Sequence, residues 1–307
     1  MRIDTDGGSR EEIESLYRIA RDFGVGMSWY LDVKSHEPWL QHFATLAGQE
    51  CGVHCYEHRP FAQYDEIHRD LGKAKRLMEG VGLRPEGVTA PYGTWSDRFA
   101  RAAEDLGFGY SSEFSLAYDS LPFTPGYKGK RFTTLQVPIH PVCVGSLLRA
   151  GYSEEGMCEY FERVIREKLA RHEPVFLYHH PSHRNWRVIR YICSRMEEEG
   201  VPSTTLGEYA TWWKRRTERS FSASLEGTRL RTRVAEGAGG AEEVLIRVTR
   251  PGGEEALIAA APEVDLQGVA WNTTLPYLPP EDIRRIREFD PRSVLGVMYS
   301  SFLRRRR

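Results

Sequence analysis

Residues 50–58 (ECGVHCYEH) place two histidines, His54 and His58, four positions apart. This spacing lets both imidazoles face one point, either from consecutive turns of a helix or from a tight loop. Neutral imidazole is the commonest protein ligand for zinc and similar ions. The segment therefore indicates part of a metal site, although an isolated pair with this spacing is more often a surface or core feature.

The amino terminus supplies two carboxylates. Residues 1–9 (MRIDTDGGS) are typical of a very short strand, a glycine turn and the start of a helix. Asp4 and Asp6 alternate with apolar or small residues and therefore share one face of the strand. One carboxylate can bind a metal while the other takes a proton from water. The alternative is an ordinary Asp-Gly-Gly turn with Asp4 as a solvated charge.

A third segment, residues 173–183 (EPVFLYHHPSH), is an apolar run that ends in three histidines. A buried parallel strand would place them at the carboxyl edge of the sheet, where α/β proteins build their sites. We expect at least one of them to be catalytic. In the alternative, His179 is a hydrogen-bonded core histidine and His183 is merely exposed.

Together these segments resemble a known family, the polysaccharide deacetylases of the NodB-homology group, carbohydrate esterase family 4. That family has an aspartate pair after its first strand, a His-x-x-x-His motif, an Arg-x-Pro-Tyr-Gly segment and a late strand ending in Leu-His or His-Pro. The corresponding segments here, in the same order, are residues 4–6, 50–58, 90–93 and 178–181. The resemblance covers about residues 1–212.

The resemblance implies the metal site and the base. Asp6, His54 and His58 would bind a divalent metal, in the first place Zn²⁺, with Co²⁺, Ni²⁺, Mn²⁺ and Fe²⁺ as alternatives. Asp4 would be the base that activates water. Thr5 separates aspartates that are adjacent in the commonest family pattern, which we interpret as the mark of a subgroup.

The resemblance also implies an acid and an oxyanion donor. His180, or its neighbour His179, would protonate the departing amine, and Tyr92 would donate its backbone N–H to the developing oxyanion. Ala90 stands where the family has an arginine that orients the base. Either another cation substitutes for that arginine, or the activity is weakened.

The residue types fit the hydrolysis of an amide. A metal with three protein ligands and an open position acidifies water and polarises the carbonyl, while a carboxylate and an imidazole divide the base and acid roles. A competing site would combine Cys51 and Cys55 with the histidines. Structural zinc sites usually show Cys-x-x-Cys spacing and a second pair, and this sequence has neither.

Strand-like and helical segments alternate along residues 1–213, which is typical of a parallel α/β barrel. The resemblance implies a distorted (β/α)7 TIM-like barrel whose groove binds an extended glycan. The predicted strands after the first are residues 26–31, 87–90, 110–112, 135–140 and 175–178, and the predicted helices are residues 10–23, 64–80, 97–106, 153–171 and 187–199.

Substrate contacts are expected near strand ends. Trp95 is the first aromatic candidate for stacking on a sugar ring, and Pro91 and His140 also fall close to the predicted site. For Trp95, packing in the core or a loop is the alternative. For His140, it is a plain core or rim role.

Residues 214–307 differ in character and predict a small β-rich domain. The signals for hairpins are alternating residues 222–234, apolar runs at 244–248 and 256–258, and turns at 237–240 and 251–253. Few aromatics other than Trp271 and Tyr277 occur there. Bracing of the barrel is therefore favoured over carbohydrate binding.

Composition is that of an ordinary enzyme. The 307 residues are 40% hydrophobic and 28% charged with a net charge of −1, so we expect no nucleic-acid partner. The run of arginines at 304–307 is interpreted as a solvated tail. Five irregularly spaced cysteines are typical of reduced thiols. Neither a transmembrane segment nor a signal peptide is recognised, and we expect a cytoplasmic location. The first predicted strand begins almost at residue 1, which leaves open a natural start upstream.

Three functions follow from the sequence. The first is a metal-dependent hydrolase that removes N-acetyl, or O-acetyl, groups from a sugar or polysaccharide. The second is a hydrolase of cyclic amides on the same scaffold, because the motifs determine the attack on the amide and leave the substrate open. The third is a non-catalytic glycan-binding descendant, which Ala90 motivates.

Overall fold

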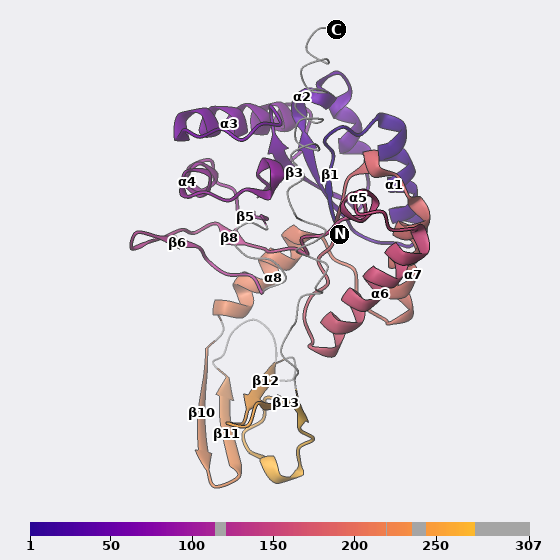
Figure 1. Cartoon of the computed structure of the whole chain (residues 1–307). Helices are drawn as coiled ribbons and strands as arrows, with labels where there is room; N and C mark the ends of the chain where they lie inside the picture. Colours follow the sequence, from indigo (N-terminus) through magenta and orange to yellow (C-terminus); the bar gives the residue numbers. More distant parts are fainter. Residues whose placement is uncertain (114–120, 219, 235–243, 274–307) are drawn as a thin grey trace. The chain divides into compact units, whose positions relative to one another are not determined.

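The computed structural model describes residues 1–113, 121–218, 220–234 and 244–273 (Figure 1). These residues fall into two compact units, one within Met1–Gly207 and the other within Glu208–Leu278. The predicted domain boundary after residue 213 falls inside a helix, α8 (Leu206–Glu218). We describe each unit by itself.

The first unit is built on a sheet of seven parallel strands, the distorted barrel that the sequence predicts. Its order is β8-β5-β4-β3-β2-β1-β9. A backbone hydrogen bond of 2.8 Å from His140 N–H to Phe176 O connects the segment after β8 to the segment before β9. The strands are β1 (Arg2–Asp4), β2 (Ser28–Asp32), β3 (Glu50–Cys55), β4 (Gly87–Val88), β5 (Tyr110–Ser111), β8 (Leu135–Gln136) and β9 (Tyr178–His179).

Helices surround this sheet (Figure 1). The five helices that the sequence predicts are confirmed to within one or two residues at each end: α1 (Arg10–Asp22), α3 (Tyr64–Gly80), α4 (Asp97–Asp105), α6 (Glu154–Ala170) and α7 (Trp186–Glu198). The shorter helices α2 (Val33–His36), η1 (Glu37–Thr45), η2 (Pro91–Gly93), α5 (Val144–Arg149) and η3 (Pro181–His183) are not predicted. A hairpin, β6 (Gly126–Tyr127) with β7 (Lys130–Arg131), extends from the loop before β8.

Alternation along β1 separates an apolar face from a polar one. Ile3 belongs to the apolar core shared with the helices, whereas Arg2 and Asp4 point to the opposite face, towards the barrel interior. Tyr30 of β2 also lies outside that core, and its ring is 5.9 Å from the Arg2 guanidinium carbon. The barrel interior is therefore lined with polar groups.

Glycine makes room for the large side chains inside the barrel. A Cβ at Gly52 of β3 would lie 2.6 Å from the Tyr30 ring, and one at Gly87 of β4 would overlap the Tyr110 ring. The two tyrosine hydroxyls are 2.6 Å apart, and Tyr110 donates to Glu50 at 2.5 Å. This network fills the interior below the carboxyl ends of the strands.

The second unit contains α8 and two three-stranded sheets, the β-rich appendage that the sequence predicts. The strands are β10 (Phe221–Glu226), β11 (Arg229–Val234), β12 (Leu245–Thr249), β13 (Glu254–Ala259), β14 (Val264–Asp265) and β15 (Asn272–Thr273), with a short helix η5 (Leu266–Gly268). Leu230, Ile246 and Ile258 form its small apolar core.

Several features of the sequence fall outside the described residues. They are the predicted turn at 237–240, Tyr277 and the arginines at 304–307. Within the described ranges, no helix combines the length and the apolar character that crossing a bilayer requires. All five cysteines lie in described segments and have free thiols.

Candidate active site

Three of the predicted ligands converge at the carboxyl ends of β1 and β3. Asp6 follows β1, His54 lies on β3, and His58 lies in the bend that follows β3. His54 Nε2 is 3.5 Å from Asp6 Oδ1, and His58 Nε2 is 3.9 Å from Asp6 Oδ2. One ligand atom from each residue lies within 4.8 Å of the other two.

The histidine pair reaches this point from a strand. The sequence offered a helix or a tight loop, and the helix is wrong because residues 50–55 form β3. The bend after β3 then brings the rings of His54 and His58 to 4.9 Å from each other. Asp70 of α3 holds this bend, since its carboxylate accepts hydrogen bonds from the backbone N–H groups of Tyr56 and Glu57.

The spacing of these atoms is at or slightly above that of a metal site, with the two histidines 3.5 and 3.9 Å from Asp6. In a tetrahedral zinc site with ligands about 2.0–2.2 Å from the metal, neighbouring ligand atoms are about 3.3–3.6 Å apart. Asp6 Oδ1 is buried and accepts no hydrogen bond from the described residues. Burial opposes ionisation of Asp6, but the imidazoles of His180, His58 and His54 lower its pKa to about 2. Asp6 is therefore a carboxylate.

Thr89 fixes the orientation of His54. Its hydroxyl is 2.8 Å from His54 Nδ1 and its carbonyl oxygen is 3.2 Å away. A proton on Nδ1 leaves the Nε2 lone pair directed at Asp6, as a metal ligand requires. Burial lowers the pKa of His54 to about 4, so the ring is neutral at physiological pH. The sequence analysis missed Thr89, although it follows β4, the strand that pairs with β3.

A cation does pair with Asp4, and it comes from two residues earlier on β1. Arg2 is 1% exposed, and its Nη2 donates to Asp4 Oδ2 at 2.5 Å. Its other amino group donates to the carbonyl oxygen of Ser112. Arg2 and Asp4 share a face because side chains alternate along a strand. The sequence analysis missed this pair, although the i,i+2 spacing is visible in residues 1–9.

Asp4 itself is buried and close to the cluster. Its Oδ1 is also buried and has no hydrogen-bond partner among the described residues. The ion pair with Arg2 therefore engages one carboxylate oxygen and leaves the second unpaired. Ala90, the position of the family arginine, is 3% exposed, and its N–H donates to Glu113 Oε1 at 3.0 Å.

Of the two neighbouring histidines, His180 lies beside Asp6. His180 Nε2 is 3.6 Å from Asp6 Oδ1. His179 pairs in register with Ile3, is fully buried, and has its ring 6.1 Å from the ring of Trp186 on α7. Burial keeps the pKa of His179 well below its usual value. Burial also tends to lower the pKa of His180, but the interactions with Asp6 and Cys143 raise it to about 9.

Tyr92 and Pro91 lie in the loop after β4. Pro91 is buried at the start of η2, and Tyr92 adopts a left-handed backbone conformation (φ 60°) with 52% of its surface exposed. The Tyr92 ring is 5.0 Å from the His58 ring. This backbone conformation is uncommon for a residue with a side chain, and strained backbone of this kind is enriched at functional sites.

The other two predicted substrate residues, Trp95 and His140, pack against aromatic side chains. Trp95 is half-buried, with its ring edge-on to Phe132 at 6.4 Å. His140 is fully buried, and its Nε2 is 2.8 Å from the hydroxyl of Tyr160. That contact corresponds to the core role that the sequence left open for His140.

Comparison with known proteins gives matches to solved structures. The sequence matches no family model and no curated protein. PuuE allantoinase has a TM-score of 0.57 at 17% identity, over 68% of this chain and 74% of that one. A protein assigned as a polysaccharide deacetylase from Mycobacterium smegmatis has a TM-score of 0.56 at 17% identity, over 67% and 78%.

A third match is a family 4 carbohydrate esterase (CE4) pseudoenzyme from Bacillus anthracis, with a TM-score of 0.50 at 18% identity over 68% of this chain. The chain spans 63% of the length of that pseudoenzyme. At the level of the fold, these matches confirm the resemblance to carbohydrate esterase family 4.

The buried Glu113 predicts a pH dependence of stability. Burial raises its pKa to about 7 from an ordinary 4.5. The folded state thus holds this proton more tightly, a stabilisation that is complete below pH 4.5 and lost as the pH rises to about 7. Relative to Glu113→Gln, which keeps the acceptor for Ala90, the wild-type free energy of unfolding should fall by on the order of 3 kcal/mol across this window.

Urea unfolding at several pH values measures this difference. Glu79→Gln, at an exposed position on α3, is the control and should follow the wild type. A constant difference between wild type and Glu113→Gln from pH 4.5 to 7 would contradict the prediction.

Proposed function

We propose that this chain is a metal-dependent hydrolase that removes N-acetyl groups from a sugar or glycan, with O-acetyl groups open to the same chemistry. The observation that carries this proposal is the convergence of Asp6, His54 and His58 beside a second carboxylate, Asp4, that does not belong to their cluster. One carboxylate is thus available as a ligand and the other as a base.

The three-residue cluster would hold a divalent cation, in the first place Zn²⁺. Such an ion polarises the carbonyl of the substrate and acidifies water. Asp6 supplies the anionic oxygen and His54 a neutral nitrogen that Thr89 orients. Two imidazoles and one carboxylate leave a coordination position open, which is typical of catalytic sites.

Asp4 would act as the general base. Arg2 holds and orients Asp4 through Oδ2, while Oδ1 remains available to take a proton from water. Arg2 would thereby replace the arginine that is missing at Ala90. It is a positioning residue in this account.

His180 would act as the general acid. Its raised pKa keeps the imidazole protonated at neutral pH, so it can give a proton to the departing amine. Tyr92 would offer its backbone N–H to the oxyanion from the loop that Pro91 opens. Trp95 and His140 are not needed for these steps. A contact of Trp95 with the glycan stays a prediction.

A cyclic-amide hydrolase is the second candidate. The likeness to PuuE allantoinase, at a TM-score of 0.57, favours it because the same fold carries that enzyme. The non-catalytic alternative rested on Ala90 and gains from the likeness to a pseudoenzyme. The buried Arg2–Asp4 ion pair is an argument against it, since the cation expected beside the base is present.

Acetate release from N-acetylated oligosaccharides, measured beside turnover of a panel of cyclic amides, tests the proposal. We expect acetate release that stops when a chelator removes the metal and resumes when Zn²⁺ or Co²⁺ is added. Cyclic-amide turnover without acetate would support the second candidate. Glycan binding without any turnover would support the third.

Asp4→Asn should lower kcat for deacetylation by about 10²–10⁴-fold, because the asparagine side chain cannot take the proton from water. The matched control is Asp65→Asn, which changes an exposed aspartate at the start of α3 and should keep the wild-type rate. Equal rates for Asp4→Asn and wild type would rule out Asp4 as the base.

Arg2→Met should lower kcat with little change in KM, because the proposed base loses the partner that orients it while the metal-binding side chains are unchanged. Arg2→Lys keeps a cation beside Asp4 and should restore kcat in part. Breaking a buried ion pair costs about 3–5 kcal/mol, so folding of both variants is checked by circular dichroism. An equal loss of kcat in Arg2→Met and Arg2→Lys, with both variants folded, would contradict a positioning role for Arg2.

A further inference from the structure

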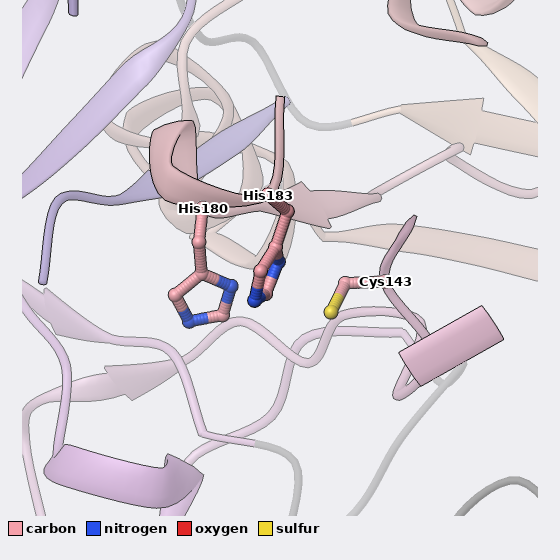
Figure 2. Close-up of side chains that lie close together, drawn as sticks. All are labelled: Cys143, His180 and His183. Atoms are coloured by element: carbon pink, nitrogen blue, oxygen red, sulfur yellow. The ribbon is translucent and has the colours of Figure 1, made fainter. Parts of the chain in front are cut away.

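A second cluster of metal-binding side chains adjoins the first. Cys143 immediately precedes α5, and His180 and His183 lie in the turn that follows β9. One ligand atom from each lies within 4.8 Å of the other two. Figure 2 shows both imidazoles side by side with the sulfur of Cys143 directed towards them, and the two rings are 4.7 Å apart.

The imidazoles of this cluster have unsatisfied nitrogens. Nδ1 of His180 and Nδ1 of His183 are both buried without a backbone partner among the described residues, and the Cys143 thiol is the side chain that interacts with both rings. His180 Nε2 is the nitrogen that lies 3.6 Å from Asp6. A buried polar atom without a partner is costly, and such atoms usually mark a bound ion or water.

The helix next to the cluster is shaped for the His183 ring. A Cβ at Gly145 on α5 would overlap that ring, so only glycine lets the imidazole lie against the helix. Cys143 is 1% exposed, and its sulfur is 3.4 Å from the hydroxyl of Ser146. The thiol is too enclosed to meet a glycan directly. Its sulfur faces the imidazoles of His180 and His183.

We propose that Cys143, His180 and His183 bind a second divalent cation, of the class that prefers thiolate and imidazole ligands, such as Zn²⁺ or Co²⁺. One sulfur and two nitrogens suit these ions, and three protein ligands leave a fourth position open. Binding requires the thiolate, so the Cys143 proton passes to solvent when the ion enters.

His180 connects the two cation sites, because it belongs to the second cluster and its Nε2 lies 3.6 Å from Asp6 of the first. Ligation at Nδ1 leaves Nε2 as the nitrogen that faces Asp6 and makes His180 a neutral imidazole, so His180 would either bind the second cation or act as the protonated acid of the proposed function. The second site does not require the hydrolase function, because its ligands can bind an ion whatever the substrate is.

Titration with Co²⁺, followed by absorption spectroscopy under reducing conditions, tests the proposal. The wild type should bind two ions per chain and show thiolate-to-cobalt charge-transfer absorption. Cys143→Ser should lose that absorption and bind one ion, whereas Asp6→Asn should lose the other ion and keep the absorption. One ion per chain without charge-transfer absorption in the wild type would overturn the second site and leave the proposed function standing.

Two further variants separate ligation from a change in packing. Cys158→Ser removes a half-buried thiol on α6 and should keep the absorption. Gly145→Ala removes no ligand but displaces the His183 ring, and it should weaken cobalt binding at the thiolate site. If Cys143→Ser fails to fold, zinc-edge X-ray absorption of the zinc-loaded wild type shows whether sulfur is among the zinc ligands. A shell with one sulfur for every two zinc ions is expected, and nitrogen and oxygen ligands alone would refute the proposal.

Discussion

The carboxyl ends of β1, β3 and β9 meet at one edge of a parallel sheet, and the candidate active site depends on this constraint. β1 pairs directly with β9, and β2 is the only strand between β1 and β3 in the sheet. Asp6 therefore lies 3.5 Å from His54 and 3.6 Å from His180, although His180 is 174 positions away in the sequence. A parallel sheet achieves this convergence without any local interaction among the three residues.

A buried charge accompanies this convergence, and Arg2 balances it. Two carboxylates near one another in a low-dielectric interior would repel, and one of them would tend to become protonated. Arg2 pairs with Asp4, while imidazoles face Asp6, so each carboxylate has its own stabilising partner. This separation allows two chemically identical groups to differ in role. In the function that we propose, Arg2 would stand in for the arginine that the resemblance led us to expect at position 90.

Local patterns pointed to the three segments that converge at the site and to most helices, because i,i+4 spacing, alternation and end signals are readable in a single segment. The strand that carries His54 was not predicted, since His54 and His58 have a spacing that also suits a helix. Thr89 and Cys143 were missed because their contacts with the histidines are tertiary, whereas Arg2 was missed although it stands only two residues from Asp4 on the same strand. The choice between His179 and His180 needed the register of β9 against β1, in which His179 pairs with Ile3 on the apolar face.

Anomalous diffraction at the zinc edge, from crystals of the zinc-loaded protein, tests the central claim most directly. The account predicts a peak at about 2.0–2.2 Å from an oxygen of Asp6 and from Nε2 of both His54 and His58. Zinc-loaded crystals without a peak among these three side chains would contradict it.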